Sequence, residues 1–411
     1  MQTGAELEHG EIDKTITYGR IYLFLVHIKM KKLLGILVLG LLTFNYALAK
    51  STKIDIKSFK VTKPIGLLDF NARRAELKSD PEFANKICTT NFYTLPKQRA
   101  ASSVEVVGHG TQYTIYNMPN PFDGDILWMD GQVSGWLRTG DNAYLKTLRD
   151  WMLASANAGS LTKLVPDPDK YFFEDPLFNL RFTLKPTFVA YDLLRQTKFL
   201  KPEENQKILD WLAPIVKNSD RRSCESKGKC KPDSKPGEHW TLHDYTTLML
   251  WGAVSGDNYY FQRGIKMYVK SLKSLSSKGA SKEVKQNAHH GLQKQNEDVG
   301  YFVMLAEIAA NQGYDLYSVE QKKKSLFTAF EYLIWGIEHP DKIYKKRTQD
   351  LLFLQKQMHS DKTPAWFEPF LRRWPDHPLS KKFSTLIKTT SRPMFGATYG
   401  GNLSCFFYRK K

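Results

Sequence analysis

Apolar residues recur every three or four positions through most of the chain, a spacing typical of amphipathic helices. Gly140-Asp141 interrupts the pattern over 133–152, and Pro186 kinks or begins the pattern over 180–194. Lys201–Glu204 is a helix-start signal for the pattern over 208–216. The helical patterns cover residues 133–152 in two pieces, 180–194, 208–216, 245–254, 259–275, 299–311 and 325–337.

Glycine-containing turns separate these patterns, so we expect a series of helical hairpins of about 40 to 50 residues each. No signature repeats at a fixed period, which favours a closed ring of hairpins over a solenoid. We therefore predict an all-α fold, an (α/α) toroid or incomplete barrel in one large domain. Strand-like alternation is confined to the edges, at residues 104–107, 111–116 and 404–408.

The N-terminus has the pattern of a targeting segment. Met30-Lys31-Lys32 precedes a run of only Leu, Ile, Val and Gly over 33–42, and Ala47-Leu48-Ala49 follows. These are the three parts of a secretory signal peptide, and the apolar run is too short to cross a bilayer. The alternative interpretation is an N-terminal membrane anchor.

We accordingly predict three parts of the chain. Residues 1–49 are an extension plus a signal peptide (Met30–Ala49), 50–84 are a linker or N-terminal arm, and 85–411 are the helical domain. Met30 is the expected true start. The protein is expected in the periplasm or secreted, with no stable membrane insertion once the signal is removed.

The charge is strongly basic, with 60 Lys and Arg against 42 Asp and Glu in 411 residues, a formal charge of +18. Residues 1–49 carry five basic and four acidic side chains, so the remainder keeps +17. Such an excess indicates an anionic partner, and for an exported protein an acidic polysaccharide is favoured over nucleic acid. The ordinary apolar content of 42% excludes a mainly disordered chain.

Four cysteines agree with an oxidising compartment. Cys224 and Cys230 bracket a polar loop, whereas Cys88 and Cys405 lie near the two ends of the mature chain. Three disulfide connectivities are possible, and the sequence leaves all three open. A zinc half-site at the first pair is less favoured, because no second half-site is found; we expect no metal.

His239 and His243 are four residues apart, so a helix places them one above the other. Trp240 stands where the zinc protease motif requires Glu, which excludes that motif. We interpret these residues as catalytic or substrate-binding. Hydrogen-bonded core histidines are the alternative.

Two further sets of polar residues are candidates for binding. His290 precedes a polar run over 293–298 that directly adjoins the apolar residues from Val299, and Arg181 and Lys185 share a helix face. The cations suit carboxylate ligands. The alternatives are a solvated helix start and a solvated helix surface.

Several short segments suggest a family. Residues 366–370 read Trp-Phe-Glu-Pro-Phe, 399–404 read Tyr-Gly-Gly-Asn-Leu-Ser, and 309–316 read Ala-Ala-Asn-Gln-Gly-Tyr-Asp-Leu. Together with the helix from Arg181 to Leu194, they resemble segments of the alginate lyase family, over about residues 85 to 408. The resemblance implies a periplasmic or secreted polysaccharide lyase with an α/α toroid.

The resemblance also implies site residues. The family's Asn-Asn-His at a helix start falls on Gly237-Glu238-His239, with His243 as a fallback. Its Tyr-His-Asn-Tyr/Phe segment falls on residues 294–297, where only Asn296 matches. Tyr301, one turn further on, is our first replacement for the proton-transferring Tyr, and Tyr113, Tyr116, Tyr245 and His290 are the alternatives.

We therefore expect β-elimination on alginate or another polyuronate, without a cofactor. The predicted catalytic residues are His239, Asn296 and Tyr301. The predicted substrate-binding residues are Arg181, Lys185, Trp240, His243 and His290.

Three other functions remain open. A glycoside hydrolase on a similar toroid needs two carboxylates, for instance among Asp123, Asp125, Asp130, Glu297 and Asp298. The second is a non-catalytic protein that binds acidic polysaccharides, which needs no such pair of carboxylates. Nucleic-acid binding is least favoured, since the chain carries no recognisable motif for it.

Overall fold

The computed structural model describes residues 54–89, 106–107, 121–165, 176–222, 239–285, 290–343, 353–354, 363–387 and 392–410. The chain divides into two compact units, Met1–Ile54 and Asp55–Lys411, and every element described below belongs to the second. The predicted signal peptide therefore lies outside the described residues. The expected domain boundary at residue 85 falls inside a helix, and 55–84 belong to the compact unit.

Helices dominate the described residues, as predicted. They are η1 (Ile56–Ser58), α2 (Phe70–Lys78), α3 (Pro81–Cys88), α5 (Pro121–Thr139), α6 (Asn142–Ala158), α7 (Pro176–Gln196), α8 (Pro202–Arg222), α9 (His239–Ser255), α10 (Asn258–Ser274), α11 (Lys282–Lys285), α12 (Gly291–Asn311), α13 (Leu326–Glu338), α14 (Pro340–Ile343), α16 (Phe367–Arg373), α17 (Pro378–Leu386), η4 (Ala397–Tyr399) and α18 (Leu403–Phe407).

Two small strand pairs lie among these helices. Strands β1 (Val106–Val107) and β2 (Leu164–Val165) pair in parallel, and β3 (Phe395–Gly396) and β4 (Gly401–Asn402) pair antiparallel. The all-α prediction with minor strands is confirmed.

The helix breaks follow local sequence signals. Gly140 adopts φ 75° and Asp141 accepts the Ala143 N–H at 2.8 Å, which ends α5 and begins α6 at the predicted position. In contrast, α7 continues through Pro186. Helix α12 begins at Gly291, well before the predicted start, because its first turns bury polar residues that the apolar pattern does not reveal.

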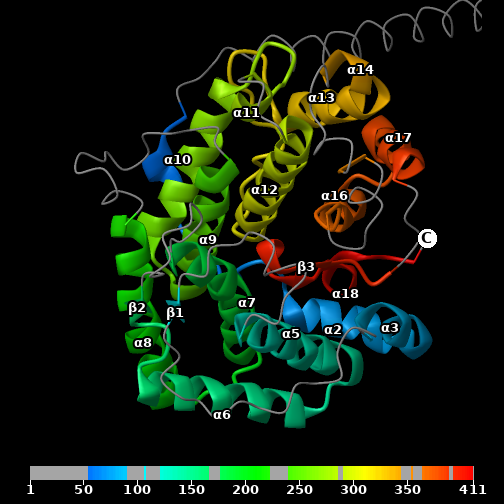
Figure 1. The fold of residues 1–411 in the computed structure, drawn as a ribbon. Helices are drawn as coiled ribbons and strands as arrows, with labels where there is room; N and C mark the ends of the chain where they lie inside the picture. The colour runs from blue at the N-terminus through cyan, green and yellow to red at the C-terminus, as the bar shows by residue number, and fades with distance from the viewer. Residues whose placement is uncertain are drawn as a thin grey trace, which may run out of the picture. The chain divides into compact units, whose positions relative to one another are not determined.

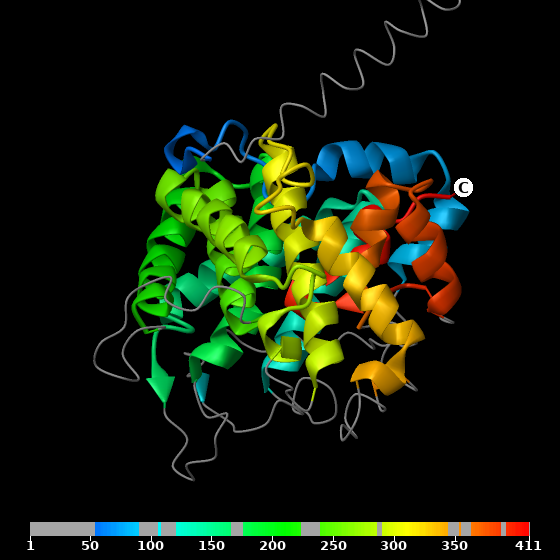
Figure 2. The same ribbon diagram turned by 90° about the horizontal axis from the view of Figure 1, so that it is seen from above.

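The helices form two layers (Figures 1 and 2). The described residues of α5, α7, α9 and α12 are largely buried, whereas α6, α8, α10 and α13 each keep one exposed face. Each of the second set packs against one of the first: α6 on α5, α8 on α7, α10 on α9 and α13 on α12. An inner row covered by an outer row is the arrangement of an incomplete α/α toroid, as predicted.

The segment before α2 is fastened to this framework by hydrogen bonds. Asp192 on α7 accepts the Gly66 N–H at 2.8 Å, and Gln312 Oε1 accepts the Thr62 and Lys63 N–H groups at 2.8 and 2.9 Å. Residues 55–69 therefore pack on α7 and the end of α12. They do not act as a free linker.

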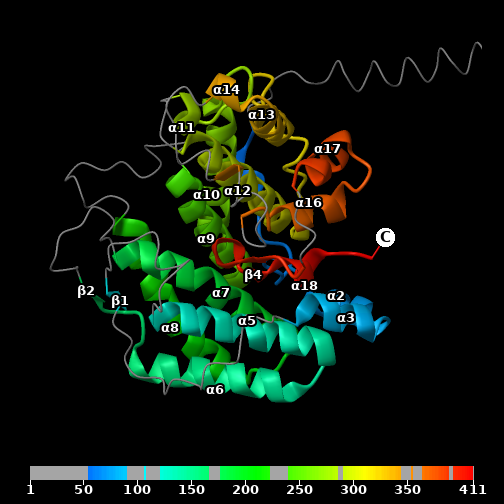
Figure 3. The same ribbon diagram turned by 45° about the vertical axis from the view of Figure 1, so that its right-hand side comes forward.

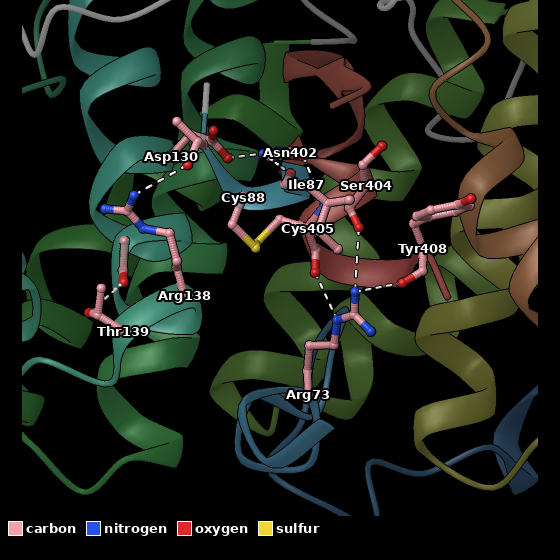
Figure 4. The surroundings of a disulfide bond; sticks show 12 residues. Arg73, Ile87, Cys88, Asp130, Arg138, Thr139, Asn402, Ser404, Cys405 and Tyr408 are labelled. Atoms are coloured by element: carbon pink, nitrogen blue, oxygen red, sulfur yellow. Dashed lines mark hydrogen bonds between the residues drawn. A yellow bond between two sulfur atoms is a disulfide. The ribbon is translucent and has the colours of Figure 1, made fainter. Parts of the chain in front are cut away.

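A disulfide joins the beginning and the end of the unit. Cys88 at the end of α3 bonds to Cys405 in α18, so one of the open cysteine pairings is now decided. Arg73 donates to the carbonyl oxygens of Cys405 and Tyr408 at 2.8 and 2.7 Å beside it (Figure 4). Cys224 and Cys230 lie outside the described residues.

The predicted strand over 404–408 is wrong. Residues 403–407 form helix α18, and the Asn402 side chain caps it by accepting the Cys405 N–H at 2.9 Å. All five residues of α18 are buried, so the alternation of polar and apolar residues did not mark an exposed face.

Within the described residues, no helix is long and apolar enough to cross a membrane.

Candidate functional site

Three inner helices bring five of the unit's polar and aromatic side chains together. Arg181 and Lys185 come from α7, His243 and Asp244 from α9, and Tyr301 from α12; we call these five the central cluster. Figure 3 shows α7, α9 and α12 meeting in the interior of the unit. Four of the five were predicted as site residues from the sequence, and Asp244 was not.

An ion pair forms the more exposed edge of the central cluster. Arg181 Nη1 lies 2.9 Å from Asp244 Oδ2, and the two side chains are 12% and 15% exposed. Arg181 Nη2 also donates to the Ser219 carbonyl oxygen at 3.1 Å. The guanidinium is thus held by one carboxylate and one carbonyl.

His243 lies beneath this pair and is 1% exposed. Its Nδ1 is 3.4 Å from Asp244 Oδ1, so the carboxylate orients the ring, and Phe182 lies 4.7 Å away between ring centroids. The His243 ring meets the Tyr301 ring edge-on at 5.5 Å. One carboxylate therefore contacts both the Arg181 guanidinium and the His243 imidazole.

Lys185 is a buried cation within the central cluster. It is 1% exposed, and its Nζ has no hydrogen-bond partner among the described residues. Nζ lies 5.4 Å from the Tyr301 ring centroid, a cation–π distance. Burial lowers the pKa of Lys185 well below its usual value; the Asp244 charge opposes that shift and the Arg181 charge adds to it.

The C-terminal segment packs against the central cluster from one side. Tyr399 in η4 lies 5.5 Å from Tyr301 between ring centroids. A Cβ at Gly300 would stand 2.5 Å from the Tyr399 hydroxyl, so only glycine allows this approach. Sequence reasoning did not select Tyr399 as a site residue, although it begins the Tyr-Gly-Gly-Asn segment of the family resemblance.

In the segment 294–297, the side chains of Lys294 and Gln295 bond to other residues of the protein. Lys294 Nζ pairs with Glu297 Oε2 at 2.9 Å, and the Gln295 amide donates to the carbonyl oxygens of Gly279 and Ala329 at 3.0 and 2.9 Å. These contacts join α12 to the loop before α11 and to α13. Lys294 and Gln295, which replace the family's Tyr and His, therefore act as packing and anchoring residues here.

Asn296 is held on both sides of its amide. Its Oδ1 accepts the Trp366 indole N–H at 3.0 Å, and its Nδ2 donates to the Thr363 carbonyl oxygen at 3.2 Å. Asn296 is 1% exposed. These two bonds fasten α12 to Thr363 and to Trp366, the first residue of the Trp-Phe-Glu-Pro-Phe segment.

The other three predicted residues lie at the starts of α9 and α12. His239 and Trp240 are the first two residues of α9, one turn before His243, and their side chains lie outside the described set. His290 is the residue before the first turn of α12 and is half-buried, without a side-chain bond that caps the helix. The i, i+4 helical spacing of His239 and His243 is as predicted.

Two buried carboxyl groups were candidates for a hydrolase. Asp130 on α5 is 3% exposed and accepts the Asn402 N–H at 2.6 Å, and burial raises its pKa to about 7. Burial, with the charges of Glu283 and Glu297, raises the pKa of Asp298 well above its usual value. Asp123 and Asp125 lie in α5, and their side chains are outside the described set. No three His, Cys, Asp or Glu side chains of the described residues are grouped as metal ligands would be.

Comparison with known proteins adds to this geometry. A family model described as alginate lyase matches residues 133–343, just over half of the chain. These residues include α7, α9 and α12 and hence the whole central cluster. No curated protein sequence matches the chain.

Solved structures with the same fold carry the same description. Alginate lyase A1-III from Sphingomonas species A1 matches with a TM-score of 0.66 and 17% identity, over 87% of this chain and 100% of that one. A Tyr-to-Phe variant of alginate lyase A1-III, complexed with tetrasaccharide, matches with a TM-score of 0.67, 17% identity and the same coverage. An alginate lyase from Bacteroides ovatus matches with a TM-score of 0.54 and 11% identity, over 83% and 94%. At these identities the likeness shows a shared fold.

Proposed function

This chain belongs to the alginate lyase family and is a polysaccharide lyase, and we propose that it cleaves an alginate-like polyuronate by β-elimination at the central cluster. The observation that supports this site is the meeting of a guanidinium, a lysine amine, an imidazole and a phenol from three helices. Such a set contains each kind of group that β-elimination at a uronic acid requires.

The carboxylate of the substrate must first be neutralised, because the C5 proton is only weakly acidic beside a charged carboxylate. We assign this task to Arg181, which its ion pair with Asp244 holds at the more exposed edge of the central cluster. Lys185 lies in the same region, and a substrate carboxylate bound there would favour its protonated form, which burial alone disfavours.

A base must then remove the C5 proton, and an acid must protonate the departing O4. We assign these two steps to His243 and Tyr301, whose rings are in contact, with Asp244 holding the imidazole in place. His239, one turn earlier on α9, is retained as an alternative base. Asn296 positions α12 through Trp366 in this scheme.

The remaining predicted residues are proposed as contacts to neighbouring sugar units. Trp240 at the start of α9 offers an aromatic face for stacking on a sugar ring, and His290 offers a polar contact at the start of α12. The two residues begin the helices that carry His243 and Tyr301. No cofactor enters any of these steps.

We also propose that the protein acts outside the cytoplasm, in the periplasm or after secretion. The apolar run 33–42 and the small residues that follow it support this location, and the Cys88–Cys405 disulfide is consistent with an oxidising compartment.

The test is to incubate the purified protein with alginate, polyglucuronate and pectate and to follow the ultraviolet absorbance of the new C4–C5 double bond. Tyr301→Phe and His243→Asn are each expected to lower kcat by about 100- to 10,000-fold, the usual worth of a positioned acid or base. Tyr260→Phe on α10 and the exposed His339→Asn are matched controls and should retain wild-type activity.

Other results would point elsewhere. Saturated products would indicate a hydrolase, and tight binding of polyuronates without turnover would indicate a binding protein. Full activity in both Tyr301→Phe and His243→Asn would mean that the central cluster takes no part in the reaction. If only His239→Ala lost activity, the base would be His239, one turn before His243 on α9.

A further inference from the structure

A second basic region lies on the surface outside the central cluster. Five lysines from three segments converge at the C-terminal end of α10: Lys273, Lys285, Lys322, Lys323 and Lys324. We call these five the lysine patch. All are exposed except Lys324. Helix α11, which carries Lys285, and helix α13, which follows Lys324, lie at the same end of the unit in Figures 1 and 3.

The last carbonyl groups of α10 hold the lysine patch together. Lys324 Nζ donates to the carbonyl oxygens of Lys273 and Leu275, and Lys285 Nζ donates to that of Ser274 at 2.7 Å. Carbonyl groups at the end of a helix carry partial negative charge and favour nearby cations. Two of the ammonium groups are thereby fixed in place, and the others remain at the surface around them.

The backbone at Lys322 and Lys323 is unusual. The two residues have φ of 53° and 61°, and Gln321 and Lys324 exchange two backbone hydrogen bonds of 2.8 and 3.1 Å around them. Positive φ at both central positions defines a type I′ turn, for which Asn-Gly is strongly preferred. The chain instead places two lysines in a strained conformation at the tip of a tight turn, where both are exposed.

The lysine patch is not neutralised by neighbouring carboxylates. Within the part of the chain that the structure describes, none of its five ammonium groups pairs with Asp or Glu. The nearest acidic residues in sequence are Glu283 on α11 and Glu320 before the turn. Burial lowers the pKa of Lys324, and the positive charges of its neighbours in the patch lower it further. A bound polyanion would relieve this repulsion.

We propose that the lysine patch is an accessory binding surface for an acidic polysaccharide, which holds a polyuronate chain outside the site of cleavage. This inference rests on the proposed function, because it takes the substrate of the central cluster as the ligand of the patch. A linear polymer with one carboxylate per sugar offers several anions to a cluster of lysines that, within the described residues, have no carboxylate partners of their own.

Helix α12 connects the two regions. Gln295 accepts the Ser281 N–H at 2.7 Å and so anchors the loop between α10 and α11, next to the lysine patch. Tyr301 follows six residues later on the same helix, about 9 Å along its axis at 1.5 Å per residue. Under this proposal a polymer of several sugar units contacts the lysine patch as well as the site of cleavage, whereas a short oligosaccharide contacts only one of them.

The turn chemistry allows a clean test. The double variant Lys322→Asn and Lys323→Gly removes two charges and installs the preferred type I′ sequence, so the fold is expected to be retained or strengthened. The matched control is Lys198→Gly with Lys201→Gln, which removes two exposed lysines near α8, one of them also at positive φ. Binding of polymeric alginate, short oligouronates, neutral dextran and duplex DNA is measured directly, and kcat and KM are measured for polymer and oligomer.

We expect the patch variant to bind polymeric alginate about 3- to 10-fold more weakly than the wild type, with a matching rise in KM, since each exposed charge contributes modestly. Its kcat and its activity on oligouronates should be unchanged, and the control should resemble the wild type. Equal polymer affinity in patch variant and wild type, or an equal loss in the control, would overturn the proposal. So would patch-dependent binding of DNA that is as tight as that of alginate.

The two proposals fail in different ways. A wild-type protein that forms no unsaturated product contradicts the proposed function, while the direct binding measurements still decide whether the lysine patch holds polyuronate. An active wild type whose polymer affinity does not depend on Lys322 and Lys323 contradicts only the accessory surface.

Discussion

Asp130 provides a sharp test of how burial governs this fold. Asp130 is a residue of α5, and its carboxyl group is buried. Its Oδ1 accepts the Asn402 N–H at 2.6 Å, which fastens the C-terminal segment to the inner helices. A Cβ at Gly401 would clash with the same oxygen. Burial raises the pKa of Asp130 from 3.8 to about 7 in the folded protein.

The sign of the effect follows from proton uptake. Between pH 3.8 and about 7 the folded protein keeps the proton on Asp130, whereas the unfolded chain has lost it. The free energy of unfolding therefore falls as pH rises through this range, by about 1.4 kcal/mol per pH unit. The full contribution is about 4 kcal/mol, present below pH 3.8 and lost above about pH 7.

The variant Asp130→Asn keeps an oxygen for the Asn402 N–H and removes the titration. Its amide adds an unpaired buried donor, which costs about 1 kcal/mol at low pH. We expect the variant to be slightly less stable than the wild type at about pH 4 and more stable by about 3 kcal/mol at about pH 8. The crossing of the two stability curves is the diagnostic feature.

The assay is urea unfolding followed by tryptophan fluorescence at several pH values. The measured quantity is the difference in unfolding free energy between wild type and variant, so other buried acids such as Asp192 cancel. Asp376→Asn, at an exposed turn, is the control and should show no crossing. A difference between wild type and Asp130→Asn that stays constant with pH would refute the reasoning, since it would mean that Asp130 ionises normally in the folded state.

Further substitutions test other parts of the structure. Cys88→Ser removes the disulfide across 317 residues and should lower the unfolding free energy by about 2 to 5 kcal/mol, read as a lower urea midpoint that reductant does not change further. Lys185→Met removes a buried, unpartnered ammonium, so it should raise the urea midpoint at neutral pH while lowering lyase activity. Because the folded pKa of Lys185 is depressed, this gain should shrink as pH rises toward 10.5; a gain that grows with pH contradicts the account. Glu307→Gln weakens a bidentate pair with Arg373 and a bond from the Tyr317 hydroxyl, and should cost about 1 to 3 kcal/mol in thermal or urea unfolding; an unchanged midpoint would count against it.

Local signals predicted most helix positions correctly. The break at Gly140-Asp141 needs only a glycine at positive φ and an aspartate cap, and both act within a few residues. The strand expected at 404–408 failed because α18 is buried on every side, so side-chain alternation there reports no exposed face. The sequence predicts a linker or N-terminal arm over 50–84, but it does not reveal that residues 62–66 bond to Asp192 and Gln312, because these partners are remote in sequence.

The candidate site was predicted in part. His243, Tyr301, Arg181 and Lys185 were selected for their chemistry, and the fold brings them together. Asp244 was overlooked, although it is the carboxylate that contacts two of them. Asn296 was selected by resemblance, yet its amide is occupied by Trp366 and Thr363, which no local pattern reveals.

Periodicity and caps depend on neighbours along the chain, and they were sufficient for the helical class and the helix break at Gly140-Asp141; the charge balance predicts an anionic partner. Three features depend on residues far apart in sequence: the pairing of Cys88 with Cys405, the meeting of α7, α9 and α12, and the convergence of the lysine patch. Only the tertiary structure decides these, because burial and contact energies act between side chains that the chain order does not place side by side.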